Sequence, residues 1–129
     1  MKTYFGIFVG LFLVMFTALE CCAAGSAEKL EPSGRLKDGI RIIEVKALKY
    51  RFEPDPIVVK LGEKVRLVVT SADVAHGLAI SEFKINLTVG TGKTESLEFV
   101  ADKKGTFRTY CTVYCGQGHA QMYASFIVK

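Results

Sequence analysis

Apolar and polar side chains alternate along most of the chain after residue 39. Ile43, Val45 and Ala47 alternate with charged residues, which is the two-residue period of a strand buried on one face. Seven further segments bounded by turn-forming or polar residues have a similar apolar character: 57–61, 65–70, 76–80, 85–87, 97–99, 107–111 and 122–128. No segment of this region keeps a helical period. About eight short strands at this spacing predict an all-β sandwich or Greek-key barrel.

A long apolar run occupies the N-terminal part of the chain. Lys2 precedes the run at 4–19, and small residues follow it up to Ala24. This order is typical of a secretory signal peptide cleaved after Ala24. Two alternatives stay open: an uncleaved anchor helix, although sixteen helical residues extend about 24 Å against about 30 Å of hydrocarbon, and a lipid anchor at 21–22. We therefore expect an exported protein, in the periplasm or at the outer face of the cytoplasmic membrane, and membrane association through residues 1–24 stays open.

The rest of the chain divides into a linker and one domain. Residues 25–39 are polar and contain three glycines and a proline, so they are predicted to link the leader at 1–24 to a domain at 40–129. A chain of 129 residues has room for one hydrophobic core. Within the domain, Pro54 and Pro56 exclude a helix and predict a bend or an edge strand.

The composition narrows the classes of partner. Lysine and arginine number 17 against 13 acidic residues, which gives a net charge of +4. This mild excess would favour an acidic protein surface, but the charges are scattered rather than clustered, so no nucleic-acid partner is expected. Half of the residues are hydrophobic, and much of that excess lies in the leader. The remainder has the composition of an ordinary soluble globular domain.

The segment 111–122 concentrates soft metal ligands. It contains Cys111, Cys115, His119 and Met122, and the chain has one other histidine, His76. A disulfide between the two cysteines would be common in an exported protein. Such a disulfide would leave the histidine and the methionine of this segment without a function. The ligand types and their spacing therefore favour a metal site.

The donor types discriminate among metals. Zinc needs no thioether, so Met122 favours copper. A mononuclear blue-copper site uses one cysteine, two histidines and a weak axial methionine, one thiolate fewer than this segment offers. Two thiolates can bridge two metals, and a dinuclear copper centre leaves no ligand idle. A lone histidine beside an apolar run is more often a core residue, but the site needs a second imidazole and His76 is the remaining one. Gly116 and Gly118 are predicted to adopt positive φ angles that wrap the loop around its metals.

These residues match the pattern of a known family. The spacing Cys111-x-x-x-Cys115-Gly116-x-x-His119-x-x-Met122, with Asp73-Val74-Ala75-His76-Gly77 upstream, resembles the copper A domain of cytochrome c oxidase subunit II. The likeness is strongest to the short B-type subunit II of haem-copper oxidases and extends from Pro54-Asp55-Pro56-Ile57 to the C-terminal end. It implies a cupredoxin fold, in agreement with the strand pattern.

The resemblance also implies a ligand set for two copper ions. Cys111 and Cys115 would bridge the coppers, His76 and Met122 would complete one, and His119 with the backbone carbonyl of Val113 would complete the other. Most members have a glutamate where this chain has valine, a change that a main-chain ligand is expected to tolerate.

The family often has a tryptophan near the copper, and this chain has none. By position alone, the aromatic candidates for that place are Tyr50, Phe52, Tyr114 and Tyr123, for each of which core or rim packing is the simpler interpretation.

The implied function is electron transfer from a cytochrome c to a haem in the catalytic subunit of a haem-copper oxidase. The chain has no Cys-x-x-Cys-His motif for covalent haem and no activated nucleophile of its own, so oxygen reduction would belong to the partner. The alternatives are a freestanding exported cupredoxin that binds or delivers copper, a soluble electron carrier, and a module like that of nitrous-oxide reductase.

Overall fold

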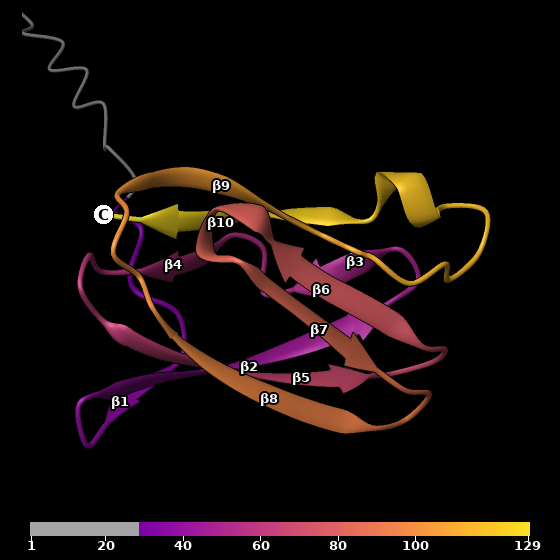
Figure 1. Cartoon of the computed structure of the whole chain (residues 1–129), viewed down its shortest axis with the longest axis horizontal. Helices are drawn as coiled ribbons and strands as arrows, with labels where there is room; N and C mark the ends of the chain where they lie inside the picture. The colour runs from indigo at the N-terminus through magenta and orange to yellow at the C-terminus, as the bar shows by residue number, and fades with distance from the viewer. Residues whose placement is uncertain (1–28) are drawn as a thin grey trace, which may run out of the picture.

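Two five-stranded β-sheets pack face to face in the part of the chain that the structure describes (Figure 1). The computed structural model describes residues 29–129, so the hypotheses on the leader at 1–24 lie outside the described residues. Among residues 29–129 there is no α-helix, and hence none long and apolar enough to cross a bilayer. The all-β prediction is confirmed.

The first sheet, sheet A, has the strand order β1-β2-β5-β8, with β3 also paired to β2. Its strands are β1 (Arg35–Lys37), β2 (Ile40–Leu48), β3 (Arg51–Glu53), β5 (Lys64–Ser71) and β8 (Thr94–Val100). The long strands β2 and β5 run parallel over eight residue pairs, from Ile40 opposite Lys64 to Ala47 opposite Ser71. The other pairs of this sheet are antiparallel.

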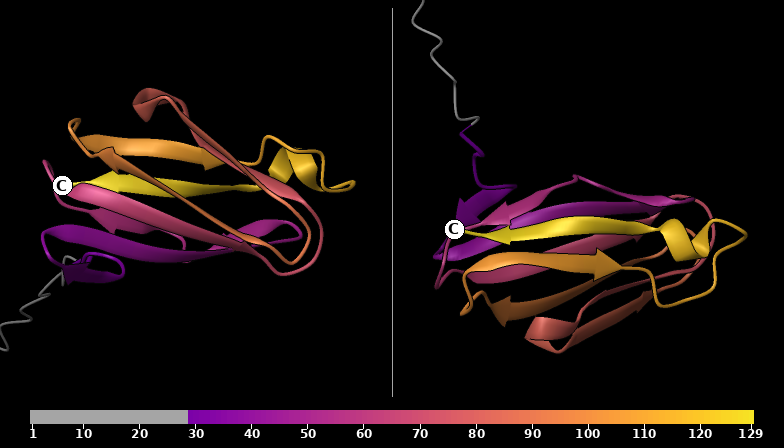
Figure 2. Two further views of the ribbon diagram at one scale, coloured as in Figure 1. Left: turned by 60° about the horizontal axis from the view of Figure 1, so that its bottom comes forward. Right: turned by 90° about the horizontal axis from the view of Figure 1, so that it is seen from above.

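The second sheet, sheet B, has the strand order β4-β10-β9-β6-β7. Its strands are β4 (Ile57–Val59), β6 (His76–Ile80), β7 (Ile85–Val89), β9 (Gly105–Tyr110) and β10 (Tyr123–Val128). Strand β10 runs parallel to β4, and the other pairs are antiparallel. Two short 3₁₀ turns, η1 (Ser81–Phe83) and η2 (His119–Gln121), complete the described elements. Figure 2 shows the two sheets as separate layers.

Every predicted strand segment contributes to a strand, and two further strands are present. Strand β1 lies inside the segment 25–39, which the sequence predicts as a linker, and it pairs with β2 across a turn at Asp38 and Gly39. All three residues of β1 are exposed, so it has no apolar period by which to be recognised. Strand β3 occupies the region before Pro54, where an edge or bend was expected.

The space between the sheets is filled by the inward positions of the alternating strands. In β5, Val65, Leu67 and Val69 are buried, and in β10 the buried ring of Phe126 packs against the rings of Phe83 and Phe99. Because each inward side chain is removed from water, this burial supplies most of the driving force for folding. The result is a rigid scaffold for the strand ends.

The topology brings the candidate ligands to one end of the sandwich. Strands β6 and β9 are antiparallel neighbours, so the start of β6, where His76 lies, is beside the end of β9, where Cys111 follows. The loop from β9 to β10 and the turn η2 project at the end opposite the C-terminus (Figures 1 and 2).

Candidate metal centre

Two buried thiols lie side by side at the base of the loop between β9 and β10. Cys111 and Cys115 are 6% and 5% exposed, and both are free cysteines. Their sulfur atoms are 3.8 Å apart, well beyond the bond length of about 2.05 Å in a disulfide. The structure therefore contains two adjacent thiols rather than the disulfide that was the simplest alternative.

An imidazole lies next to each thiol. His76, fully buried at the start of β6, has Nδ1 3.9 Å from Sγ of Cys111. His119, half-buried in η2, has Nδ1 3.6 Å from Sγ of Cys115. The ligating atoms of His76 and both cysteines all lie within 4.8 Å of one another. A histidine from β6 and a histidine from the loop thus flank the pair of thiols.

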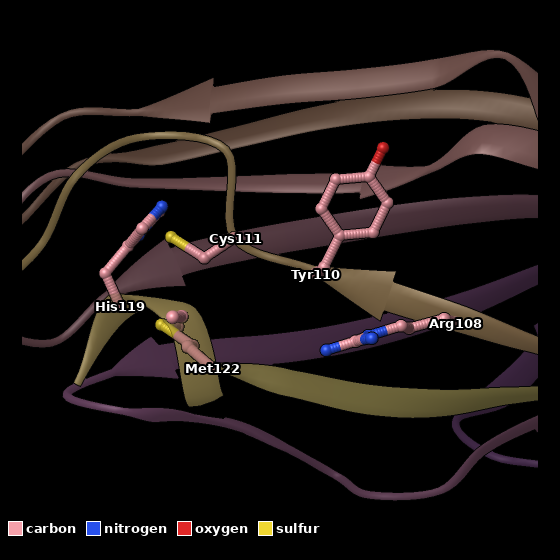
Figure 3. Close-up of a pocket in the computed structure, with 6 residues that line it drawn as sticks. Arg108, Tyr110, Cys111, His119 and Met122 are labelled. Atoms are coloured by element: carbon pink, nitrogen blue, oxygen red, sulfur yellow. The ribbon is translucent and has the colours of Figure 1, made fainter.

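The remaining predicted ligands are also adjacent to the thiols. Sδ of Met122 lies 3.7 Å from Sγ of Cys115, and the Cys111 thiol donates to the Val113 carbonyl at 3.1 Å. Figure 3 shows Cys111, His119 and Met122 grouped at one end of a cleft. All six predicted ligand groups therefore converge at one place, and their binding of metal stays a prediction.

The spacing of neighbouring donors is compatible with shared metal ions. Two donors that bind the same ion at about 2.0–2.3 Å can lie at most about 4.6 Å apart, and the donor pairs given above are separated by 3.1–3.9 Å. Thiolates, a thioether and imidazoles are the ligand types that copper prefers. The residues present therefore fit a soft metal centre.

The Cys115 thiol is held in its protonated form when no metal is bound. Burial, the hydrogen bond with Cys111 and the charges of Cys111 and Asp73 raise the pKa of Cys115 to about 11. A cation must displace this proton before it can bind to the thiolate. Metal affinity at this site is therefore expected to rise with pH.

A carboxylate orients His76 toward the thiols. The Nε2 of His76 faces Oδ1 of Asp73 at 2.6 Å, while backbone N–H groups of Val74 and Lys49 donate to the same carboxylate at 2.6 and 2.8 Å. Burial raises the pKa of Asp73, but these hydrogen bonds, from Lys49, His76 and Val74, outweigh it and lower that pKa to about 2. The charged carboxylate favours the tautomer with the proton on Nε2, which leaves the Nδ1 lone pair facing the thiols.

The role of Asp73 was not predicted from the sequence pattern. A carboxylate three residues before a candidate histidine ligand is the signal that could have revealed it, because ligating histidines commonly donate their second N–H to a carboxylate. Its other two partners, both backbone groups, leave no trace in the sequence pattern.

The first residues of the loop between β9 and β10 pack against β6 and β7. A Cβ atom at Gly77 would lie 2.0 Å from Oγ1 and 2.8 Å from the backbone nitrogen of Thr112, so only glycine fits there. The Thr112 hydroxyl donates to Oδ1 of Asn86 at 2.8 Å. Thr112 lies between Cys111 and Val113, so these contacts fix the loop where two of the predicted ligands are found.

The two loop glycines differ in backbone conformation. Gly116 has a φ of 137°, a positive value as expected. Gly118 has a φ of −90°, so the expectation of a positive angle was wrong there. A Cβ at Gly118 would lie 2.3 Å from the ring of Tyr50, which shows that glycine is required for close packing instead. Tyr50, between β2 and β3, thereby supports the loop.

The other three aromatic candidates occupy different environments. Phe52 is a fully buried core residue, in line with the simpler interpretation of packing. Tyr114 is 75% exposed, with its ring centroid 5.7 Å from that of His119. Tyr123 lies under the guanidinium of Arg108, whose Cζ is 4.3 Å from the ring centroid.

A two-layer β-sandwich with a loop of soft ligands between its last two strands defines the chain as a cupredoxin. Residues 38–128 match the model of the cytochrome c oxidase subunit II periplasmic-domain family, and the chain belongs to that family. Residues 38–128 therefore form a domain of the kind that subunit II has in the periplasm.

Relatives of known name agree with this assignment. One cytochrome c oxidase subunit 2 of Thermus thermophilus is 27% identical, over 95% of this chain and 84% of its own length. A second subunit 2 from Thermus thermophilus is 32% identical over 67% of this chain and 64% of its own. The nitrous-oxide reductase of Cupriavidus necator is 32% identical over 75% of this chain, which spans 16% of that enzyme.

Solved structures support the same fold. A chain of a haem-copper terminal oxidase dimer aligns with a TM-score of 0.66 and 26% identity, covering 80% of this chain and 74% of its own. The periplasmic domain of cytochrome oxidase subunit II from Bradyrhizobium japonicum aligns with a TM-score of 0.64 at 22% identity, covering 78% of this chain and 88% of its own. The predicted cupredoxin fold is confirmed.

Proposed function

We propose that this chain transfers electrons through a dinuclear copper centre, as the subunit of a haem-copper oxidase that receives electrons from a cytochrome c. Cys111 and Cys115 would bridge two copper ions, with His76 and Met122 on one and His119 and the Val113 carbonyl on the other. The acceptor would be a haem in the catalytic subunit. The two bridged coppers would share one electron between them.

The observation that carries this proposal is the pair of unbonded thiols with an imidazole on each side. A mononuclear blue-copper site would leave one of the two thiols unused, and a buried thiol 3.8 Å from a second one is what a bridging pair requires. Family membership supports the proposal independently.

The residues around the thiols favour transfer with little structural change. Burial of His76, Cys111, Cys115 and Met122 limits the contact of these donors with water. The Asp73 carboxylate and the contact of Tyr50 with the loop glycines hold ligand-bearing segments in fixed positions. Ligands that are fixed in this way need little reorganisation when the charge of the centre changes, and hydrogen bonding around the sulfurs tunes the potential.

Copper reconstitution of the Cys115→Ser variant tests the proposal. The wild-type protein is expected to bind two copper ions per chain and to give a purple, mixed-valence centre whose unpaired electron couples to both nuclei. The variant should lose that spectrum, because one bridge is gone. Copper content, visible absorption and paramagnetic resonance are the measurements, and Ser96→Ala, an exposed change on β8, is the control.

Two outcomes would contradict the proposal. A purple centre that survives in Cys115→Ser would show that the second thiol does not bridge. A wild-type protein that takes up a single copper and stays colourless would favour the alternative of a freestanding protein that binds or delivers copper.

A further inference from the structure

A cleft of about 300 Å³ opens beside the proposed ligands. It is lined by Arg108, Tyr110, Cys111, His119, Ala120 and Met122. Figure 3 shows Cys111, His119 and Met122 at one end of this cleft and Arg108 and Tyr110, both from β9, at the other. Three of the six lining residues are proposed metal ligands, so the cleft leads from the surface to the soft donors.

Arg108 differs from every other arginine of the chain. The other four each form an ion pair with a glutamate: Arg35 with Glu44, Arg41 with Glu63, Arg51 with Glu53 and Arg66 with Glu98. Among residues 29–129, Arg108 has no carboxylate partner, and its guanidinium lies over the Tyr123 ring. Stacking on a ring leaves the N–H groups at the guanidinium edge available to an anion.

The charge of the cleft selects the form in which copper can enter. No acidic side chain lines the cleft, and Arg108 places a positive charge beside it. A bare cuprous ion would be repelled by that charge, whereas an anionic complex of the same ion would be attracted. A fork of N–H donors suits carboxylate groups in particular.

We propose that this cleft receives copper as a small anionic copper(I)–thiolate complex whose carboxylate binds Arg108. This inference rests on the proposed function of the site as a copper centre. In the transfer, the bond between copper and the sulfur of the carrier breaks, and a bond from copper to Sγ of Cys111 forms. The Cys111 thiol proton moves to the departing thiolate. Copper stays cuprous throughout, so no oxidant or reductant is consumed.

The test compares two copper(I) sources offered to the metal-free protein. One is the complex with glutathione, a thiol that carries carboxylates, and the other is the cationic complex with acetonitrile. The Arg108→Gln variant should take up copper from the glutathione complex about three- to fivefold more slowly than wild type, the range expected for an exposed charge pair. Uptake from the acetonitrile complex should be unchanged or faster.

Controls separate this effect from a general loss of charge or fold. Arg35→Gln removes the same charge from exposed strand β1 and should leave both rates unchanged. Arg108→Lys should restore part of the rate with glutathione, and about 0.5 M salt should remove most of the difference between wild type and Arg108→Gln. Equal unfolding free energies of the variants would exclude misfolding as the cause.

The inference is overturned if Arg108→Gln takes up copper from the glutathione complex at the wild-type rate, or if it slows uptake from both sources equally. If the wild-type protein binds copper from neither source, the proposed function itself fails. If Arg108→Gln keeps the wild-type uptake rates and still forms the purple centre, this inference is rejected while the proposed function stands.

Discussion

The two sheets of the sandwich differ in what they carry: most ion pairs involve sheet A, and the predicted metal ligands lie on or beside strands of sheet B. Five ion pairs involve strands of sheet A or the turn before β5, among them the bidentate pair of Arg41 with Glu63, which is largely buried. All six predicted ligands lie on β6 or on the connection between β9 and β10. These three strands belong to sheet B. Among the described residues, the corresponding contact of a sheet B strand is the hydrogen bond between His76 and the Asp73 carboxylate.

This division separates the stability of the scaffold from the chemistry of the site. The sheets communicate at the turn between β2 and β3, where the Lys49 backbone donates to Asp73 and the Tyr50 ring packs on the loop glycines. Changes within sheet A should therefore alter mainly stability, changes of the predicted ligands should alter mainly the metal centre, and changes at this turn should alter both.

The largest effect on stability is expected from Leu67→Ala. Leu67 is fully buried in β5, and truncation of a buried leucine costs about 2–5 kcal/mol through lost burial and a residual cavity. Denaturant unfolding of the metal-free protein measures this cost, and Leu36→Ala, at a position 59% exposed, is the control. The copper spectrum of the folded variant should match wild type. A changed spectrum would show that the two sheets are coupled through the core.

A change at the turn between β2 and β3 tests whether contacts from sheet A support the metal site. Tyr50→Ala removes a half-buried ring that lies against Gly116 and Gly118, and we expect a loss of about 2 kcal/mol, near half the cost of a fully buried aromatic side chain. Copper should also dissociate faster, because the loop loses its support. Chelator competition measures the dissociation rate, and Tyr50→Phe, which keeps the ring, should behave as wild type. Unchanged copper release in Tyr50→Ala would confine this residue to packing.

Much of this fold follows from alternation in the sequence. Strands such as β5 and β10 bury every second side chain, and the period of two records that burial directly. Strand β1 escaped prediction because its side chains are all exposed and its pairing is made by backbone groups, which have no sequence signature.

The site was predictable as far as its side chains have distinctive chemistry. The cysteines, histidines and Met122 are rare in this chain, so their convergence could be inferred. The support of the loop by Tyr50 could not, because it depends on a close approach between segments far apart in the sequence. Gly118 illustrates the limit: the need for glycine was expected, but its cause is a neighbouring ring rather than a positive φ.

A smaller effect, dependent on pH, is expected at the buried ion pair of sheet A. The hydrogen bond from Arg41 holds the pKa of Glu63 below its usual value. The same hydrogen bond raises the pKa of Arg41. A carboxylate with a lowered folded-state pKa stabilises the protein above its unfolded pKa of about 4.3, and this contribution is lost as the pH falls through the folded value. Glu63→Gln should therefore cost about 1–2 kcal/mol at pH 7 and less at pH 3.

Denaturant midpoints of the metal-free protein from pH 3 to pH 7 measure this dependence. Glu95→Gln, at an exposed position of the neighbouring strand β8, is the control and should change stability little. A loss in Glu63→Gln that is the same at both ends of the pH range would show that shape rather than charge matters at this position.

Met122→Leu is expected to have the smallest effect on stability. It also tests most directly whether the metal site can change while the scaffold keeps its stability. Met122 is 1% exposed, and exchange of methionine for leucine in a core usually costs less than about 1.5 kcal/mol, because volume is conserved. The thioether is lost, however, so copper should stay bound with an altered reduction potential. Leu78→Met, the reverse exchange at a buried position of β6, should leave the potential unchanged. Redox titration followed by absorption measures both variants. If Met122→Leu keeps the wild-type potential and spectrum, the sulfur 3.7 Å from Cys115 is a packing group and the centre has one ligand fewer than proposed.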